Sequence, residues 1–312
     1  MREQRHPLPQ LQSTFFLTDG GLETTLVFHK GIDLPHFAAF VLLDDENGRA
    51  AMRDYYRTYL DLASAAGHGF VLETPTWRAN GDWGAKLGFD TRGLVDINSR
   101  ALEFIADLRN EYAGSGVPIV LSGNIGPRGD GYTADDRMSA EAACEYHCPQ
   151  VFTFAECGAD VVTAMTLTYP AEAIGIVEAA KKAGLPSVIG FTTETDGRLP
   201  NGQTLRSAIE EVDAASGGGP SYYMVNCAHI EHFNDALEDD QSWTRRIAAV
   251  RANASRLSHA ELDECEHLDD GNPEEFGELC LALKQRFPGI SVFGGCCGTD
   301  HRHIEAAIRR VA

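Results

Sequence analysis

The feature that most limits the fold of this chain is a regular alternation between short apolar runs and longer amphipathic stretches. Eight runs rich in β-branched and aromatic residues recur along the chain, at 14–21, 69–76, 118–126, 159–168, 186–194, 222–229, 246–255 and 290–298. Stretches with helical periodicity separate them, for example 50–67, 94–114, 171–184 and 272–287. Glycine or proline follows several of these stretches, as is expected where a helix ends.

The apolar runs predict strands that are covered on both faces, because they are continuous rather than alternating with polar residues. Eight such strands, mostly followed by helices, predict an α/β fold with a single (β/α)8 TIM barrel over residues 1–312. A doubly wound open sheet is the alternative, and it would carry a G-x-G-x-x-G motif after its first strand. The segment TDGGLETTL at 18–26 lacks that spacing, so the barrel is favoured. We expect residues 1–13 to form a flexible N-terminal segment.

The net charge limits the partners. With 46 acidic against 26 basic residues the chain carries a formal charge of −20, which disfavours nucleic acid because phosphates are bound by clustered Lys and Arg. No apolar run approaches the ~20 residues of a membrane helix, and the polar N-terminus lacks the apolar core of a secretory signal. We therefore expect a cytoplasmic protein that acts on small molecules away from membranes. The sequence does not indicate the oligomeric state.

Polar side chains follow almost every predicted strand. In a parallel barrel the C-terminal ends of the strands meet at one mouth, where the active sites of TIM barrels lie. The residues at these positions are Asp19, Glu73, Thr74, Asn124, Thr166, Thr193, Glu194, Asn226, Cys227, Asn253, Cys296 and Cys297. The sequence therefore predicts a ring of functional groups around that mouth.

Three of the eight cysteines lie at the ends of two nearby strands, in VNCAH and GGCCGT. Cys227 ends the sixth strand and Cys296 and Cys297 end the eighth, so their backbones are expected roughly 10 Å apart on one rim. Adjacent residues of a regular strand point to opposite faces, so the glycines around the pair predict a turn that presents both thiols. Three thiolates with one open position are typical of a catalytic Zn²⁺ site.

Other interpretations of these thiols are open. A disulfide between Cys296 and Cys297 would indicate a metal-buffering or redox-sensing barrel that is not an enzyme. His229, His301 and His303 are alternative ligands, although the last two begin the final predicted helix and are expected to face solvent.

The five remaining cysteines are expected to be ordinary thiols, because eight cysteines in a chain of this length are too sparse for a disulfide scaffold. They are Cys144, Cys148, Cys157, Cys265 and Cys280. Cys144 and Cys148 share one helical face and would allow a metal pair, but no second pair accompanies them.

A site with three thiolates carries net negative charge, which weakens it as a Lewis acid for water and favours a soft ligand in the open position. A substrate thiol bound there loses its proton at neutral pH and remains nucleophilic. The predicted reaction is attack of that thiolate on an alkyl group carried by a good leaving group. A zinc hydrolase or lyase is the alternative, with Glu73 or Glu194 as general base.

The segments DGGLETTL, SGNIGPRGDGY, VNCAH and GGCCGTDHRHI, in this order, resemble the zinc-dependent homocysteine S-methyltransferase family over about residues 14–310. The resemblance implies a (β/α)8 barrel with Cys227, Cys296 and Cys297 as Zn²⁺ ligands. It implies transfer of a methyl group from a small sulfonium or ammonium donor to a thiol, with homocysteine giving methionine as the expected reaction. A chain of 312 residues has no room for cobalamin and folate domains, so no bound methyl carrier is expected.

The resemblance also implies residues that bind substrate. Asp19, with the backbone of Gly20 and Gly21, would contact the amino-acid part of homocysteine. Asn226 would support the metal site and Asn124 would line the pocket. We expect two threonines at the ends of the second and fourth strands, Thr74 and Thr166, to complete this set.

The fourth strand departs from the family pattern. The family usually ends it in a Phe-Glu-Thr-like stretch whose glutamate helps to hold the substrate ammonium, whereas TAMTLTYP places Met165 there. Burying an unpaired ammonium costs several kcal/mol, so Glu73 and Arg78 are candidates to bind the substrate's charged end, unless they pair with each other. Without a replacement carboxylate, the same chemistry would act on a different thiol. Met165 and Trp77 could also receive the cation of a methyl donor.

Overall fold

The computed structural model describes residues 8–12, 15–265 and 267–311, and its centre is a closed barrel of parallel strands. The strands pair in sequence order and β8 closes onto β1, which confirms the predicted (β/α)8 barrel. The strands are β1 Phe16–Leu17, β2 Gly69–Glu73, β3 Ile119–Ile125, β4 Val161–Leu167, β5 Ser187–Phe191, β6 Tyr222–Asn226, β7 Ile247–Ala252 and β8 Val292–Gly295. Each is shorter than its apolar run, because residues at the ends of the run leave the ladder and enter loops.

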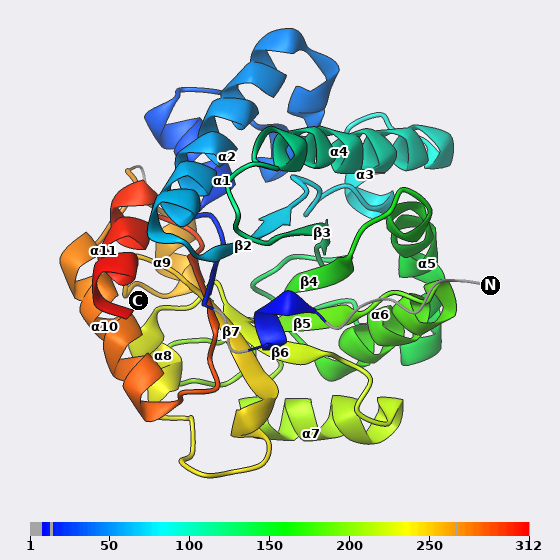
Figure 1. Cartoon of the computed structure of the whole chain (residues 1–312). Coiled ribbons are helices and arrows are strands. Elements are labelled where there is room, and N and C mark those ends of the chain that lie inside the picture. The colour runs from blue at the N-terminus through cyan, green and yellow to red at the C-terminus, as the bar shows by residue number, and fades with distance from the viewer. Residues whose placement is uncertain (1–7, 13–14, 266, 312) are drawn as a thin grey trace.

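The helices form a ring around these strands, as Figure 1 shows. The longer ones are α2 Glu46–Ala66, α4 Thr91–Glu111, α5 Ala140–Glu156, α6 Pro170–Ala183, α7 Leu205–Ser216, α10 Pro273–Arg286 and α11 His301–Val311. Shorter helices lie in the loops that follow β1, β2, β6 and β7, namely α1 Leu22–Thr24, α3 Gly81–Lys86, α8 Ile230–Asn234 and α9 His259–Asp263. The helices predicted from periodicity are confirmed as α2, α4, α6 and α10. Among the helices of the described ranges, none has both the length and the apolar character needed to cross a membrane.

Local sequence signals set the ends of the helices. The Asp45 side chain accepts the Gly48 N–H at 2.8 Å and caps the start of α2. Gly67 ends that helix with φ 70°, a left-handed conformation that suits glycine. Pro170 opens α6, and Gly184 closes it with φ 69°. These capping residues determine where α2 and α6 begin and end.

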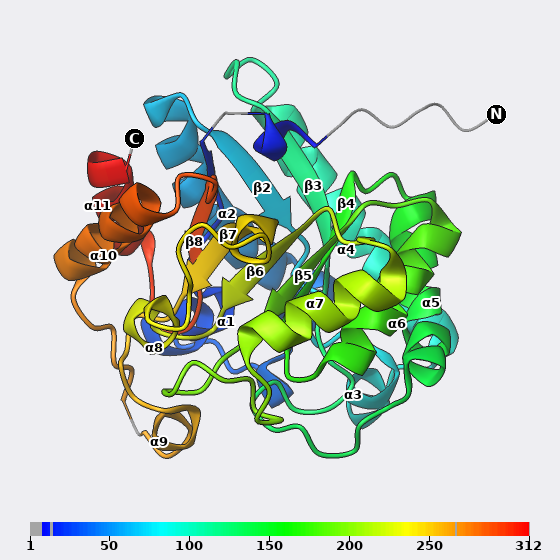
Figure 2. The same ribbon diagram turned by 90° about the horizontal axis from the view of Figure 1, so that it is seen from below.

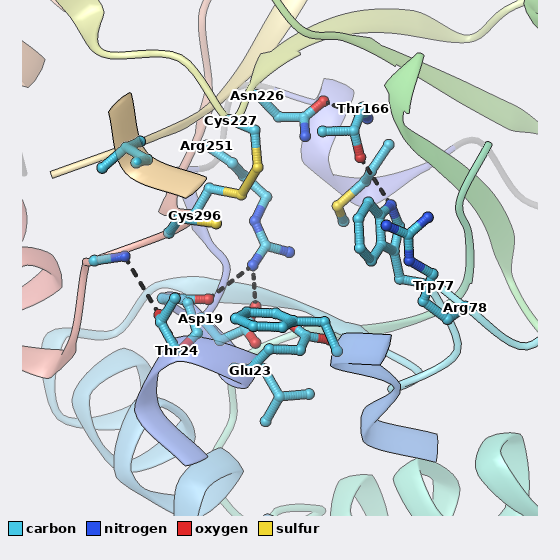
Figure 3. A pocket seen from close by; sticks show the side chains of 18 of the residues that line it. Asp19, Glu23, Thr24, Trp77, Arg78, Thr166, Asn226, Cys227, Arg251 and Cys296 are labelled. Atoms are coloured by element: carbon cyan, nitrogen blue, oxygen red, sulfur yellow. Dashed lines mark hydrogen bonds and ion pairs between the residues drawn. A yellow bond between two sulfur atoms is a disulfide. The ribbon is translucent and has the colours of Figure 1, made fainter. Parts of the chain in front are cut away.

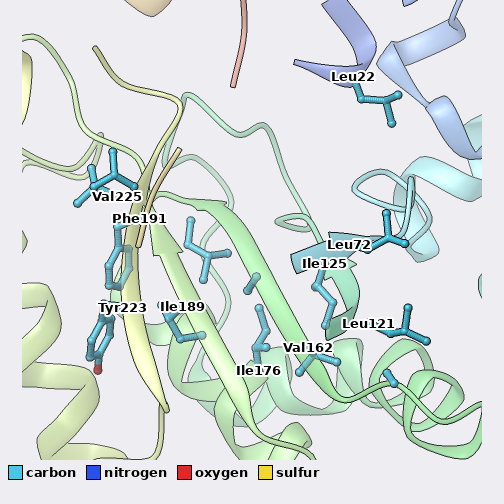
Figure 4. Packing of buried hydrophobic residues seen from close by; sticks show 14 of the residues in the cluster. Leu22, Leu72, Leu121, Ile125, Val162, Ile176, Ile189, Phe191, Tyr223 and Val225 are labelled. Carbon is cyan, nitrogen blue, oxygen red and sulfur yellow. The ribbon is translucent and has the colours of Figure 1, made fainter. Parts of the chain in front are cut away.

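Two apolar layers hold the barrel together. The outer layer lies between strands and helices and includes Leu121, Val162, Ile189, Phe191 and Val225 (Figure 4). The inner layer fills the barrel itself, with Leu8, Phe16, Val71, Val120, Val161, Met165, Val188, Tyr222, Met224, Ala248, Ala249 and Val292. Because both faces of the strands are covered by apolar side chains, the strands are continuous apolar runs in the sequence.

The N-terminal end of the barrel is closed by the chain itself. Residues 1–7 and 13 of the segment that was predicted to be flexible lie outside the described residues. Residues 8–12 pack on the barrel, where Gln10 is fully buried and its Nε2 donates to the Tyr222 hydroxyl at 3.3 Å. The Ser291 hydroxyl donates to the Gln10 carbonyl at 2.8 Å. Figure 2 shows this segment and α9 at opposite ends of the barrel, so the other end is left for the site.

Candidate metal centre and substrate cavity

Two departures from strand geometry bring three cysteines together at the mouth. Cys227 follows β6 with φ 53°, so the chain turns sharply where that strand ends. Cys296 and Cys297 lie in a turn after β8 that is closed by the Thr299 N–H donating to the Cys296 carbonyl at 3.1 Å. Gly298 occupies the third position of this turn with φ 79°, a conformation that favours glycine. The turn predicted from the flanking glycines is therefore present.

The three sulfur atoms lie within 4.8 Å of one another. Tetrahedral zinc with Zn–S bonds of about 2.3 Å needs sulfurs about 3.8 Å apart, so this cluster fits a single ion after small side-chain adjustments. Cys227 and Cys296 are joined as a disulfide, with their Cα atoms 5.3 Å apart. The alternative bond between adjacent Cys296 and Cys297 is therefore wrong, and Cys297 Sγ instead lies 3.5 Å from the Tyr132 hydroxyl. Two of the three proposed ligands must be reduced before they can bind a metal.

The histidines considered as alternative ligands lie outside this cluster. His229 caps α8 by accepting the Glu231 N–H at 3.3 Å, and burial lowers its pKa to about 4. His301 is exposed, as expected. His303 was expected to face solvent, and that is wrong: it is fully buried between the Asp300 carboxylate, at 3.2 Å, and the Asp270 carbonyl, at 2.9 Å.

A cavity of about 450 Å³ opens beside the sulfurs. All twelve residues predicted for the metal and substrate sites line it, namely Asp19, Gly20, Gly21, Glu73, Thr74, Asn124, Met165, Thr166, Asn226, Cys227, Cys296 and Cys297. Thr193, Glu194 and Asn253 also follow strands, but they are not among the described residues that line it. The polar ring around the mouth is therefore only partly turned toward the cavity.

The most strongly charged part of the cavity wall is a buried cluster around Arg251 of β7. Its Nη2 donates to Asp19 Oδ1 at 2.6 Å and its Nη1 forms a short ion pair with Glu73 Oε2. Its Nε donates to the Gly295 carbonyl at 3.0 Å. The second oxygen of Asp19 accepts the Tyr55 hydroxyl at 3.0 Å. Asp19 and Glu73 thus share one cation of the chain, the guanidinium of Arg251.

The fields in this cluster are strong because it is buried. Burial raises the pKa of Asp19 and of Glu73, and the Arg251 guanidinium opposes both shifts. Burial alone would lower the pKa of Arg251, but the carboxylates of Asp19 and Glu73 outweigh it and raise that pKa above its usual range. Arg251 therefore remains charged and holds the two acidic strand ends together.

Glu73 and Arg78 do not pair with each other, which corrects one of the expectations for them. The Arg78 guanidinium is sandwiched between the rings of Trp77, at 3.9 Å, and Trp83, at 3.7 Å. Its Nη1 donates to the Gly129 carbonyl at 3.1 Å. Figure 3 shows Trp77 and Arg78 on one side of the cavity and Arg251 with Cys227 and Cys296 on the other.

The ends of β4 and β6 are tied together by side chains of the predicted substrate set. Thr166 has φ 57°, and its N–H donates to Asn226 Oδ1 at 3.0 Å. Trp77 Nε1 donates to the Thr166 hydroxyl at 2.7 Å. A left-handed conformation costs a non-glycine residue about 1–3 kcal/mol and is typically kept where a site needs it. Asn226, the last residue of β6, thus ties that strand to the backbone of Thr166 in β4.

The loop after β1 packs directly against the cysteine turn. The Gly21 N–H donates to the Thr299 carbonyl at 3.0 Å, and the Gly20 carbonyl accepts from Arg251 at 3.1 Å. A Cβ atom on Gly21 would lie 2.6 Å from the Cys296 carbonyl oxygen, so no larger residue fits there. The DGG and CCGT segments therefore form one unit of structure.

Sequence reasoning missed several residues of the cavity wall, including Glu23, Tyr132, Arg251 and Cys265. A signal existed for Arg251, which is the one charged residue inside the apolar strand β7. Glu23 belongs to the DGGLETTL segment but was not singled out there. Cys265, expected to be an ordinary thiol, also lines the cavity. Cys144 and Cys148 lie away from the cavity with their sulfurs 3.9 Å apart.

Comparisons with known proteins agree on what this chain is similar to. Homocysteine S-methyltransferase YbgG of Bacillus subtilis is 23% identical over 331 residues, covering 96% of each chain. Selenocysteine Se-methyltransferase of Brassica oleracea is 23% identical over 328 residues, covering 95% of this chain and 89% of that protein. The metallated form of homocysteine methyltransferase MmuM from Escherichia coli matches the fold with a TM-score of 0.75 and 22% identity, over 98% of this chain and 100% of that one.

The oxidized form of the same Escherichia coli protein gives a TM-score of 0.76, also at 22% identity, over 98% of this chain and 99% of that one. Likeness at this level of identity concerns the fold. The sequence model of the family described as Homocysteine S-methyltransferase matches residues 16–311, nearly the whole chain. The chain belongs to the homocysteine S-methyltransferase family.

Proposed function

We propose that this protein is a zinc-dependent S-methyltransferase, which moves a methyl group from a small sulfonium or ammonium donor to a thiol. The observation that carries the proposal is the convergence of Cys227, Cys296 and Cys297 within 4.8 Å beside a cavity of about 450 Å³. A cluster of three thiolates suits zinc better than harder metals. We place the activity in the cytoplasm, where reducing conditions keep these thiols available.

Zinc held by these cysteines would lower the pKa of a substrate thiol while leaving its sulfur nucleophilic. The chain itself supplies the geometry around that thiol. Asn226 fixes the ends of β4 and β6, and the turn at Gly298 presents Cys296 and Cys297 together. Methyl transfer forms a carbon–sulfur bond to the acceptor and breaks the bond from the methyl group to the donor's sulfur or nitrogen. The donor leaves with its electron pair as a neutral thioether or amine.

Homocysteine, giving methionine, is the first acceptor to test, because related proteins carry homocysteine or selenocysteine in their names. A second candidate is a thiol without an amino group. It is favoured by the pairing of Asp19 and Glu73 with Arg251, and by the uncharged Met165 on the cavity wall. Both candidates use the same metal cluster.

The test is an assay of reduced, zinc-loaded protein with paired donors and thiols, followed by removal of the metal with a chelator. We expect methyl transfer that is lost with zinc, returns when zinc is added back, and is absent in Cys296→Ser. Full activity of Cys296→Ser would overturn the proposal. Breakdown of the donor without any thiol would instead favour a zinc hydrolase or lyase.

A further inference from the structure

Among the residues that the structure describes, five carboxylate side chains line the cavity, and four of them have a partner within the chain. Asp19 and Glu73 pair with Arg251. Asp130 accepts the Tyr132 N–H at 2.7 Å, and Asp269 accepts the Ser255 hydroxyl at 2.5 Å. Each of these four carboxylates therefore has a hydrogen-bond or ion-pair partner on another residue of the chain.

Glu23 is the fifth carboxylate, and it differs from the others. It follows the DGG loop in α1, is partly buried, and lines the cavity. Its carboxylate has a hydrogen bond with its own backbone, but among the described residues no side-chain hydrogen bond and no ion pair joins it to another residue. A desolvated carboxylate without a counter-charge is costly, so Glu23 is suited to a cation that enters from outside.

Arg78 carries the opposite charge and, in the part of the chain that the structure describes, likewise lacks a close counter-charge. It is 6% exposed, and its Nε has no hydrogen-bond partner among the described residues. Its Nη2 lies 4.0 Å from the nearest carboxylate oxygen, that of the largely exposed Asp130. The faces of Trp77 and Trp83 hold the guanidinium in place without accepting hydrogen bonds from it. Burial lowers the pKa of Arg78 to about 10, which still leaves it charged at neutral pH.

Glu23 and Arg78 influence each other without forming an ion pair. Burial raises the pKa of Glu23 and the Arg78 charge opposes that shift, whereas burial lowers the pKa of Arg78 and the Glu23 charge opposes that one. Among the described residues no contact within 4 Å joins them, although Figure 3 shows both on the wall of the same cavity. Two opposite charges that face one cavity and stay apart are matched by a ligand whose own charges are separated.

We propose that Glu23 and Arg78 bind the two ends of a small zwitterionic substrate, with Glu23 at its onium group and Arg78 at its carboxylate. The inference rests on the proposed function, which supplies an onium donor or an amino-acid thiol as the ligand. Arg251 is what directs the cation to Glu23, because it occupies Asp19 and Glu73. The two residues set substrate specificity.

The test measures binding by calorimetry on reduced, zinc-loaded protein, with four probes. Homocysteine and glycine betaine carry both charges, 4-mercaptobutanoate carries only the carboxylate, and tetramethylammonium carries only the cation. We expect Glu23→Gln to weaken the binding of tetramethylammonium about tenfold and to leave the affinity for 4-mercaptobutanoate within twofold of the wild-type value. We expect Arg78→Gln to weaken the binding of 4-mercaptobutanoate about tenfold and to leave the affinity for tetramethylammonium within twofold of the wild-type value. Both variants should bind a zwitterion more weakly than the wild type does.

The two zwitterions identify the source of the ligand. If the binding of glycine betaine depends on both residues, the ligand of this site is the methyl donor. If the binding of homocysteine depends on both residues, the ligand is the thiol acceptor. Glu103→Gln and Arg92→Gln make the same chemical changes on the exposed surface of α4 and serve as matched controls. Thermal unfolding and zinc content show whether each variant is folded and loaded.

Three results would overturn this proposal: binding of all four probes within twofold of wild type in both variants, equal loss of both singly charged probes in each variant, or no binding of either zwitterion to the wild type. Because these binding measurements need no turnover, failure of the proposed function can be distinguished from failure of this binding proposal. Charge-specific binding without methyl transfer for any donor and thiol would contradict the proposed function and would still support the binding roles of Glu23 and Arg78.

Discussion

The two ends of the barrel are built from the same eight strands but from opposite chemistry. The N-terminal end is filled with apolar side chains such as Phe16 and Val71 and is closed by Leu8. The C-terminal end holds three cysteines, two buried carboxylates and the Arg251 guanidinium. The difference shows that apolar packing fills the N-terminal end of the barrel interior, whereas the buried polar and charged groups lie at the C-terminal mouth. There a ligand can offset the free-energy cost of burying them.

The largest expected effect concerns the metal at the mouth. The disulfide between Cys227 and Cys296 and a zinc ion use the same two sulfurs, so they exclude one another. We expect reduced protein to bind about one zinc per chain and oxidised protein to bind none, with loss of methyl transfer after oxidation, because cysteine binds a metal as the thiolate. Metal analysis before and after treatment with a reductant measures this. Equal zinc content in both forms would show that other groups hold the metal.

The next largest effect is a loss of folding stability, which we expect to be larger for a substitution at the mouth than for one at the closed end. Arg251→Met leaves Asp19 and Glu73 as uncompensated buried carboxylates, which we expect to cost about 3–5 kcal/mol in the free energy of unfolding. Denaturant unfolding measures it. The triple variant that also carries Asp19→Asn and Glu73→Gln should recover most of the loss.

Arg246→Met is the matched control, because it removes a guanidinium near the start of the same strand. Arg246 pairs with a partly exposed Asp213, so we expect a loss of no more than about 1 kcal/mol. Equal losses for the two arginines would contradict the assignment of a special electrostatic role to the mouth.

A smaller effect tests the charge at Glu23 through pH. Burial, and next the Asp19 charge, raise its pKa to about 7, and the charges of Arg251 and Arg78 oppose the shift. Below pH 7 the group is mostly protonated, so its affinity for a cation rises as pH rises. Between pH 6 and 8 the ionised fraction grows about tenfold, and tetramethylammonium should bind about tenfold more tightly. A rise of the same size in Glu23→Gln would place the titrating group elsewhere.

The smallest effect is expected at the closed end. Tyr222→Phe removes the acceptor of the buried Gln10 side chain, at a cost of about 1 kcal/mol in the free energy of unfolding. Methyl transfer should be unchanged, because Tyr222 does not line the cavity. Chemical denaturation and the standard assay check the two halves of this prediction. A drop in activity without a drop in stability would show that the two ends are coupled.

The eight strands and the cysteine cluster were predictable from the sequence because both depend on local signals. Continuous apolar runs report burial on both faces, and glycines around Cys296 and Cys297 report a turn. The orientation of His303 was predicted wrongly, since its position at the start of a helix says nothing of the neighbouring loop. The backbone carbonyl of Asp270, which lies in that loop, accepts a hydrogen bond from His303 Nε2.

The sequence alone determined the barrel, the order of its strands and the meeting of three thiols at one rim, because periodicity and strand order carry that information. Only the tertiary structure decided which charges neutralise each other. Arg251 reaches Asp19 and Glu73 across 232 and 178 residues of chain, and closure of the barrel is what places these strand ends together. Pairing between charges depends on distance in space, which no local pattern records, and so the role left to Glu23 emerged only from the folded molecule.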